Sequence, residues 1–140
     1  MKKIFGIVSA LFLLSTMTVC AQNFKVIVNN ANTASSVTTK ELSDFFLKRK
    51  SKWSSGGGVE VIDLGAKSST RESFSSSVLG KSTAQVRAFW QQAVFSGANT
   101  PPREANNEAE VVEFVKNNPG AIGYVSPGAN TSGVKTLTVK

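Results

Sequence analysis

Short apolar runs rich in β-branched residues alternate along this chain with segments of helical periodicity, and this alternation most constrains the fold. Residues 24–29 (FKVIVN), 59–64 (VEVIDL) and 121–125 (AIGYV) have the composition of buried strands, and 134–139 (VKTLTV) that of a weaker terminal strand. The residues between the first three runs carry apolar side chains at helical spacing. Strands that alternate with helices predict an α/β fold with a parallel or mixed sheet.

The first two predicted helices begin at hydroxyl side chains. Thr39 is a candidate N-cap for a helix that buries one apolar face, made of Leu42, Phe45 and Phe46. The basic run 48–52 ends this helix, where cations suit the negative end of the helix dipole. A second helix follows the turn at 65–69, and Leu79-Gly80 closes it.

Two further helices are predicted in the second half of the chain. Thr83 is a candidate N-cap for the third, whose apolar face is made of Val86, Phe89, Trp90, Ala93 and Val94. The fourth covers residues 108–117 and stops at Pro119-Gly120. Residues 96–106, which contain Pro101-Pro102, are predicted to form a loop between them.

Residues 1–21 have the pattern of a secretory signal. Lys2 and Lys3 precede a mainly apolar stretch over residues 4–19, and small residues near Ala21 suit cleavage before Gln22. A membrane anchor is disfavoured because polar and small residues interrupt the stretch, which falls short of about 20 apolar residues. Lipoprotein processing at Cys20 is a further alternative. We therefore predict one domain over residues 22–140, in a periplasmic or secreted protein.

The chain contains no histidine, and its only cysteine lies in the predicted signal. Catalysis by serine or cysteine with histidine, and ordinary zinc sites, are thereby excluded. We expect neither enzyme activity nor a metal or cofactor. The net charge of +7 would suit anionic ligands, anionic lipid or cell-surface polymers, but a basic charge without a specific partner is the stronger interpretation. The run 48–52 is short and has no array of aromatic residues, so a nucleic-acid partner is not expected.

Residues 63–74 (DLGAKSSTRESF) are the segment best suited to bind a ligand. A strand enters a turn of small residues, and a helix begins at once with unpaired backbone N–H groups and a positive dipole end. Ser68, Ser69 and Thr70 add hydroxyl donors, and Arg71 with Lys67 adds positive charge. This chemistry suits a tetrahedral oxyanion. The alternative is an ordinary helix cap, since serine and threonine begin many helices that bind nothing.

Four stretches, taken in order, make the chain resemble a known family. They are residues 40–48 (KELSDFFLK) followed by Trp53, residues 68–74 (SSTRESF), residues 94–102 (VFSGANTPP), and residues 119–125 (PGAIGYV). Together they resemble the phosphate-binding subunit of bacterial phosphate ABC transporters, and its short single-domain relatives in particular. The resemblance implies a single lobe of the type II periplasmic-binding-protein fold, with a mixed sheet flanked by helices.

The resemblance also implies a function. It predicts a periplasmic solute-binding protein for phosphate or a similar oxyanion, bound where the helix near Ser69 begins. The family motif transfers to Ser68 and Thr70, whereas Ser69 replaces a glycine and Arg71 enters from its chemistry alone. The predicted ligand-binding residues are therefore Ser68, Ser69, Thr70 and Arg71. Membrane components of an ABC transporter and a second copy of this chain are predicted partners.

An alternative function is that of a half-size envelope interaction or structural protein without a role in transport. The family carries an arginine and an aspartate just before its serine, where this chain has Leu64 and Ala66. The chain also has room for about one lobe of a two-lobed protein. These departures favour the alternative, and the retained hydroxyl-rich loop favours binding.

Overall fold

A computed structural model describes residues 23–140. The predicted signal at 1–21 lies outside these residues and stays a prediction. The helices are α1 (Thr39–Phe46), α2 (Ser69–Phe74), α3 (Thr83–Phe95) and α4 (Glu108–Asn117), and α2 continues into a π-helical segment, η1 (Ser75–Leu79). The strands are β1 (Lys25–Asn29), β2 (Ser36–Val37), β3 (Glu60–Leu64), β4 (Arg103–Ala105), β5 (Ala121–Val125) and β6 (Val134–Val139).

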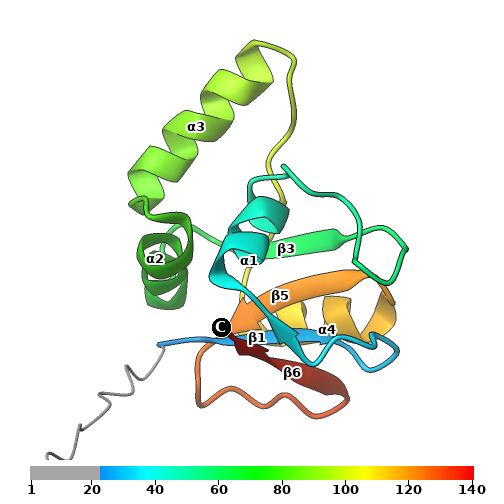
Figure 1. Ribbon diagram of the computed structural model, residues 1–140. Coiled ribbons are helices and arrows are strands. Elements are labelled where there is room, and N and C mark those ends of the chain that lie inside the picture. The colour runs from blue at the N-terminus through cyan, green and yellow to red at the C-terminus, as the bar shows by residue number, and fades with distance from the viewer. Residues whose placement is uncertain (1–22) are drawn as a thin grey trace, which may run out of the picture.

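The strands form one mixed sheet in the order β2-β6-β1-β5-β3-β4 (Figure 1). β1 runs antiparallel to both β5 and β6, and β3 runs parallel to both β4 and β5. The carboxyl ends of β3, β4 and β5 therefore lie along the same edge of the sheet. The predicted α/β class with a mixed sheet flanked by helices is confirmed.

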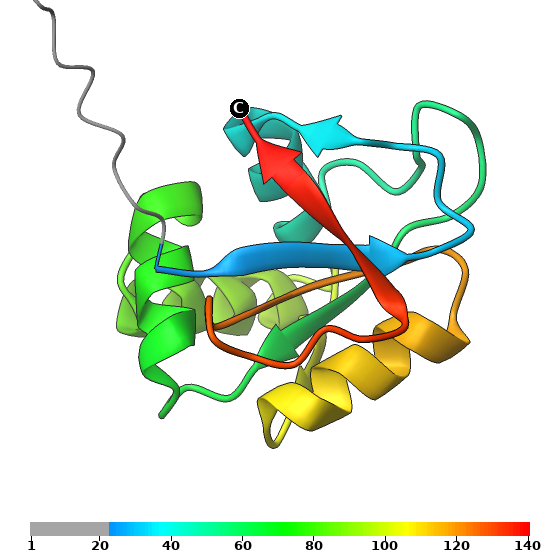
Figure 2. The ribbon, with the colours of Figure 1, turned by 90° about the horizontal axis from the view of Figure 1, so that it is seen from below.

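Helices cover both faces of the sheet, and β5 is buried throughout (Figures 1 and 2). On one face, Tyr124 stacks on Phe74 of α2 with ring centroids 3.8 Å apart, and Phe46 of α1 packs against both rings. On the other face, the backbone at Gly123 lies against Val111 of α4. Alternation of side chains along β5 thus places an aromatic cluster on one side and a close helix contact on the other.

The N-caps of two helices lie one residue before the predicted cap residues. The hydroxyl of Thr38, not of Thr39, accepts from the third amide of α1, and Ser82, not Thr83, caps α3. Ser82 and Gln85 form a reciprocal capping box. Each start carries two adjacent hydroxyl residues, and the residue with extended backbone angles is the cap. Sequence alone does not show which of the two that is.

α3 and the segment after it differ most from expectation. Val94 was expected on the buried face, but it is 52% exposed, and Phe95 at the end of the helix is 90% exposed. Val86 and Trp90 are buried as expected. The predicted loop at 96–106 contains β4, whose three residues are too few to show a strand pattern. β2 was not predicted for the same reason.

Within residues 23–140, no helix has both the length and the apolar character needed to cross a bilayer.

Candidate functional site

Three parallel strands end together at the candidate site. β3 ends at Leu64, β4 at Ala105 and β5 at Val125. A tight turn of four residues separates β3 from α2, and two residues separate β4 from α4. Ligands of open α/β sheets bind at the carboxyl ends of the strands, where such loops and helix starts gather.

The start of α2 borders a pocket of about 370 Å³. In the turn before it, the amide of Ser68 donates to the carbonyl of Gly65 at 3.0 Å. The Ser68 hydroxyl accepts from the amide of Arg71 at 3.2 Å, and Ser69 is exposed. The pocket lies between the two loops that follow β3 and β4, and its lining is Leu64, Gly65, Lys67, Ser68, Asn106, Asn107 and Glu108.

The start of α4 forms the opposite wall of this pocket. The Asn107 side chain caps the helix and accepts from the amide of Glu110 at 2.9 Å. The carboxylate of Glu108 instead reaches across to other segments. Its Oε1 accepts from the Thr70 hydroxyl at 3.1 Å and from the Ser126 amide at 2.8 Å, and its Oε2 accepts from the Ser126 hydroxyl at 2.8 Å. Glu108 thus joins α4 to α2 and to the end of β5.

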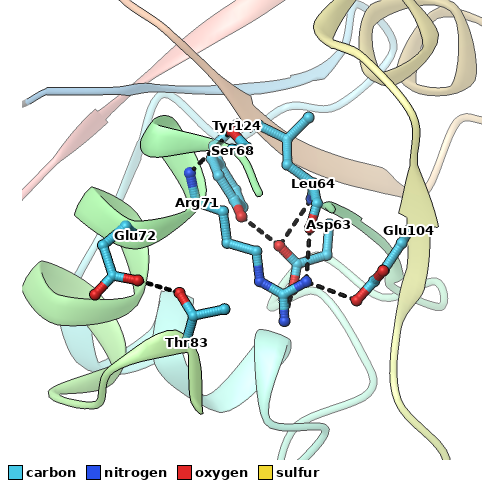
Figure 3. A network of polar contacts seen from close by, with 8 residues as sticks. All are labelled: Asp63, Leu64, Ser68, Arg71, Glu72, Thr83, Glu104 and Tyr124. Carbon is cyan, nitrogen blue, oxygen red and sulfur yellow. Dashed lines mark hydrogen bonds and ion pairs between the residues drawn. The ribbon is translucent and has the colours of Figure 1, made fainter. Parts of the chain in front are cut away.

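The Arg71 side chain points from α2 into the interior, toward the end of β3 (Figure 3). Its Nη1 donates to the Leu64 carbonyl and to Glu104 Oε1, both at 2.6 Å, and its Nη2 lies 3.8 Å from Asp63 Oδ2. The Tyr124 hydroxyl donates to Asp63 as well. A buried cation is therefore balanced by two carboxylates behind the site.

Burial governs the titration of this network. It raises the pKa of the Asp63 carboxyl, although the charge of Arg71 and the hydrogen bond from Tyr124 act in the opposite direction. Burial, followed by the charge of Asp63, also raises the pKa of the Tyr124 hydroxyl. The neighbouring carboxylates outweigh burial at Arg71 and raise the pKa of its guanidinium. The Tyr124 phenol therefore stays protonated.

The four residues predicted to bind the ligand lie close together but in different surroundings. Ser68 lines the pocket and Ser69 is exposed at the start of α2. The Thr70 hydroxyl is bound to Glu108, and the Arg71 guanidinium is bound to the Leu64 carbonyl and to carboxylates. Nothing in these contacts tests ligand binding, so the assignment of all four residues stays a prediction.

Sequence reasoning missed the contributions of the β4–α4 loop and of β5. Neither Glu108 nor Ser126 was among the residues predicted to bind the ligand. Both follow strands parallel to β3, so knowledge of strand order would have brought them to the same edge. Asp63 was not among the predicted ligand-binding residues either, and it is 5% exposed.

A larger hollow of about 540 Å³ lies beside α3, and Ala66 of the β3–α2 turn, Arg71 and Glu104 belong to its lining. Its lining combines apolar side chains, among them Trp90, Phe95 and Pro101, with polar and charged ones that include Arg71 and Arg87. In the described part of the chain, no group of three or more histidine, cysteine, aspartate or glutamate side chains is placed to hold a metal ion. The pocket at the carboxyl edge is taken as the candidate site because Lys67, Ser68 and the start of α4 meet there.

Comparison with known proteins supports the fold. No protein-family model and no curated protein matches the sequence. Solved structures do match. The ABC-type phosphate transport receptor of Vibrio cholerae has a TM-score of 0.66 and 21% identity over 84% of this chain and 46% of its own. A protein of Clostridium perfringens assigned as a phosphate ABC transporter substrate-binding protein, solved with bound phosphate, has a TM-score of 0.66 and 18% identity over 84% and 44%.

The phosphate-binding protein of Stenotrophomonas maltophilia matches less closely, with a TM-score of 0.54 and 17% identity over 85% of this chain and 39% of its own. This chain thus spans less than half the length of these structures. The fold is that of periplasmic phosphate-binding proteins, and the resemblance inferred from the motifs is confirmed at the level of the fold.

Proposed function

We propose that this protein is a solute-binding module that takes phosphate or a similar tetrahedral oxyanion at the carboxyl edge of β3, β4 and β5. One observation carries the proposal: the starts of α2 and α4 face one polar pocket that Lys67 and Ser68 also line. Helix starts offer unpaired amides and positive dipole ends to an anion. Lys67 adds a charge at the rim.

In this proposal, Ser68, Ser69 and Thr70 supply the hydroxyl and amide donors at the start of α2. Arg71 stands behind this pocket, where Asp63 and Glu104 balance its charge, and it fixes the end of β3 through the Leu64 carbonyl. The neighbouring structures, which are described as phosphate receptors or binding proteins, support this ligand class. They are transport proteins rather than enzymes, which supports a non-enzymatic role.

The setting and partners follow from the predicted signal at 1–21. Cleavage there would place the protein in the periplasm or outside the cell, where membrane components of an ABC transporter would receive the ligand. A single lobe leaves one side of the ligand open to water, so we expect weak affinity. A second copy facing the same pocket would close that side, and a homodimer is part of the proposal.

Calorimetry with phosphate, and separately with sulfate, tests the proposal. Ser68→Ala and Ser82→Ala form a matched pair, because each removes the hydroxyl cap of one helix. Each is expected to cost about 1 kcal/mol of stability. Only Ser68→Ala should weaken oxyanion binding. Phosphate at about 10 mM would saturate even a site with a Kd of about 1 mM. A folded protein that gives no heat at that concentration contradicts the proposal.

The second candidate function is the half-size interaction protein of the envelope. The observation that favours it is the apolar end of α3, where Phe95 is 90% exposed and Val94 is 52% exposed. Exposed apolar patches mark interaction surfaces. Sedimentation of the protein and of Phe95→Ser discriminates the two functions. Association that is lost with Phe95→Ser, in a protein that binds no oxyanion, favours this candidate.

A further inference from the structure

The Glu108 carboxylate accepts three hydrogen bonds from residues outside its own helix. The Thr70 hydroxyl donates from α2, and both the amide and the hydroxyl of Ser126 donate from the end of β5. Both carboxylate oxygens are thus engaged, at 2.8 to 3.1 Å. Donors of this kind bind the oxygens of any small oxyanion.

Glu108 is not needed to cap α4. The Asn107 side chain serves that purpose, and Glu110 in the same turn accepts from the Asn106 amide at 2.9 Å. Glu113, one turn further on, is exposed and accepts from Asn117. Among the glutamates of α4, Glu108 therefore stands apart because it crosses to two neighbouring segments.

Glu108 lines the pocket and also accepts the hydrogen bonds from Thr70 and Ser126, so these donors adjoin the pocket. An oxyanion that enters beside Lys67 and Ser68 meets this carboxylate. Like charges at such close range repel strongly in a partly dehydrated site. The entering anion must bind farther out, or Glu108 must leave its three donors.

We propose that Thr70 and Ser126 form an oxyanion cradle and that Glu108 is its resident occupant, which an entering oxyanion displaces. This inference rests on the proposed function and deepens it. Glu108 then sets the affinity of the site, because each binding event must break its three hydrogen bonds. The displaced carboxylate moves out toward solvent, and the oxyanion takes the Thr70 hydroxyl and both Ser126 donors.

The test compares Glu108→Ala with Glu113→Ala, which removes the same charge from an exposed position of the same helix. Calorimetry with inorganic phosphate is expected to give a Kd about ten-fold lower for Glu108→Ala than for the natural protein. Glu113→Ala should change the Kd by less than about two-fold. Phosphate binding by Glu108→Ala that is no tighter than by Glu113→Ala overturns the inference.

The same measurements distinguish a failure of this inference from a failure of the proposed function. A natural protein that binds no phosphate, beside a Glu108→Ala variant that does, supports the cradle and contradicts the proposed function. A natural protein that binds phosphate, beside a Glu108→Ala variant that binds it no better, does the reverse. If neither binds, both fail.

A second measurement decides the matter if Glu108→Ala does not fold. In the natural protein, added phosphate should shift the NMR signals of the Ser126 amide and of the Glu108 side-chain carboxyl carbon together. A parallel titration with sulfate shows whether Thr70 and Ser126 distinguish phosphate from sulfate. A Ser126 amide that stays unmoved in phosphate, when other amides of the pocket shift, overturns the inference.

Discussion

At the residue scale, one buried cation connects three parts of the molecule. Arg71 lies on α2, Asp63 on β3 and Tyr124 on β5, and their side chains meet behind the candidate site (Figure 3). Arg71 also holds the Leu64 carbonyl, the last carbonyl of β3. The position of the loop that leads to Ser68 therefore depends on this network.

Loss of Arg71 should destabilise the fold strongly. In Arg71→Ala, the Asp63 carboxylate and the Leu64 carbonyl lose a buried partner, which is expected to cost about 3 kcal/mol. Arg87→Ala is the control, because Arg87 lies exposed on α3. Urea unfolding measures both variants. Equal small losses in the two would show that the network contributes little.

The raised pKa of Asp63 predicts a pH dependence of stability. A carboxyl whose pKa is raised on folding adds stability below its unfolded pKa and loses it as pH rises through the folded pKa. The unfolding free energy of the natural protein, minus that of Asp63→Asn, should therefore fall as pH rises from about 4 toward neutral. Urea titrations at several pH values measure this difference. A difference that grows with pH contradicts the assignment.

Gly123 in the 119–125 motif has a packing role that can be tested. A Cβ at this position would lie 2.7 Å from Val111 Cγ1 and 3.0 Å from Ile62 Cγ2. Gly123→Ala should therefore lower stability by about 1–3 kcal/mol through overpacking between the sheet and α4. Gly128→Ala is the matched control, because a Cβ there meets nothing within 4 Å. Thermal unfolding compares the two, and equal midpoints would exclude this role.

At the scale of elements, α3 is the least integrated helix. It extends away from the sheet (Figure 1), and its closest neighbour is η1 rather than a strand. Thr83 at its start donates to Glu72 of α2, and Val86 and Trp90 bury its inner face. The remaining face and the far end are open to solvent. Such an element can open without unfolding the sheet.

Removal of the Trp90 side chain should release α3 selectively. In Trp90→Ala, amide hydrogens of α3 should exchange at least about ten-fold faster, while those of β5 keep their rates. Native-state hydrogen exchange followed by NMR measures both in one sample. A uniform acceleration across α3 and β5 would show instead that α3 is part of one cooperative unit.

At the scale of the whole molecule, the sequence predicts the helices and strands better than it predicts the tertiary contacts between them. β1, β3, β5 and α4 are predicted within one or two residues because their apolar patterns are strong. β2 and β4 are missed because edge strands of two or three residues carry no period. Ser68 to Arg71 could be proposed as ligand-binding residues from local chemistry. Glu108 and Ser126 could not be, since their contact with Thr70 depends on strand order.

The mixed strand order also explains why one lobe can present a site by itself. β1 alone runs opposite to the other five strands, so the carboxyl ends of β3, β4 and β5, and the loops that follow them, gather at one edge. That edge carries the start of α2, the start of α4 and Ser126. Binding of an oxyanion at this edge is the central claim.

An amide chemical-shift map of the isotope-labelled protein in rising phosphate tests this claim most directly. Saturable shifts are expected to concentrate in residues 65–70, 106–108 and 126, with α3 unaffected. A map in which phosphate shifts no amide, or shifts only amides of α3, would contradict it.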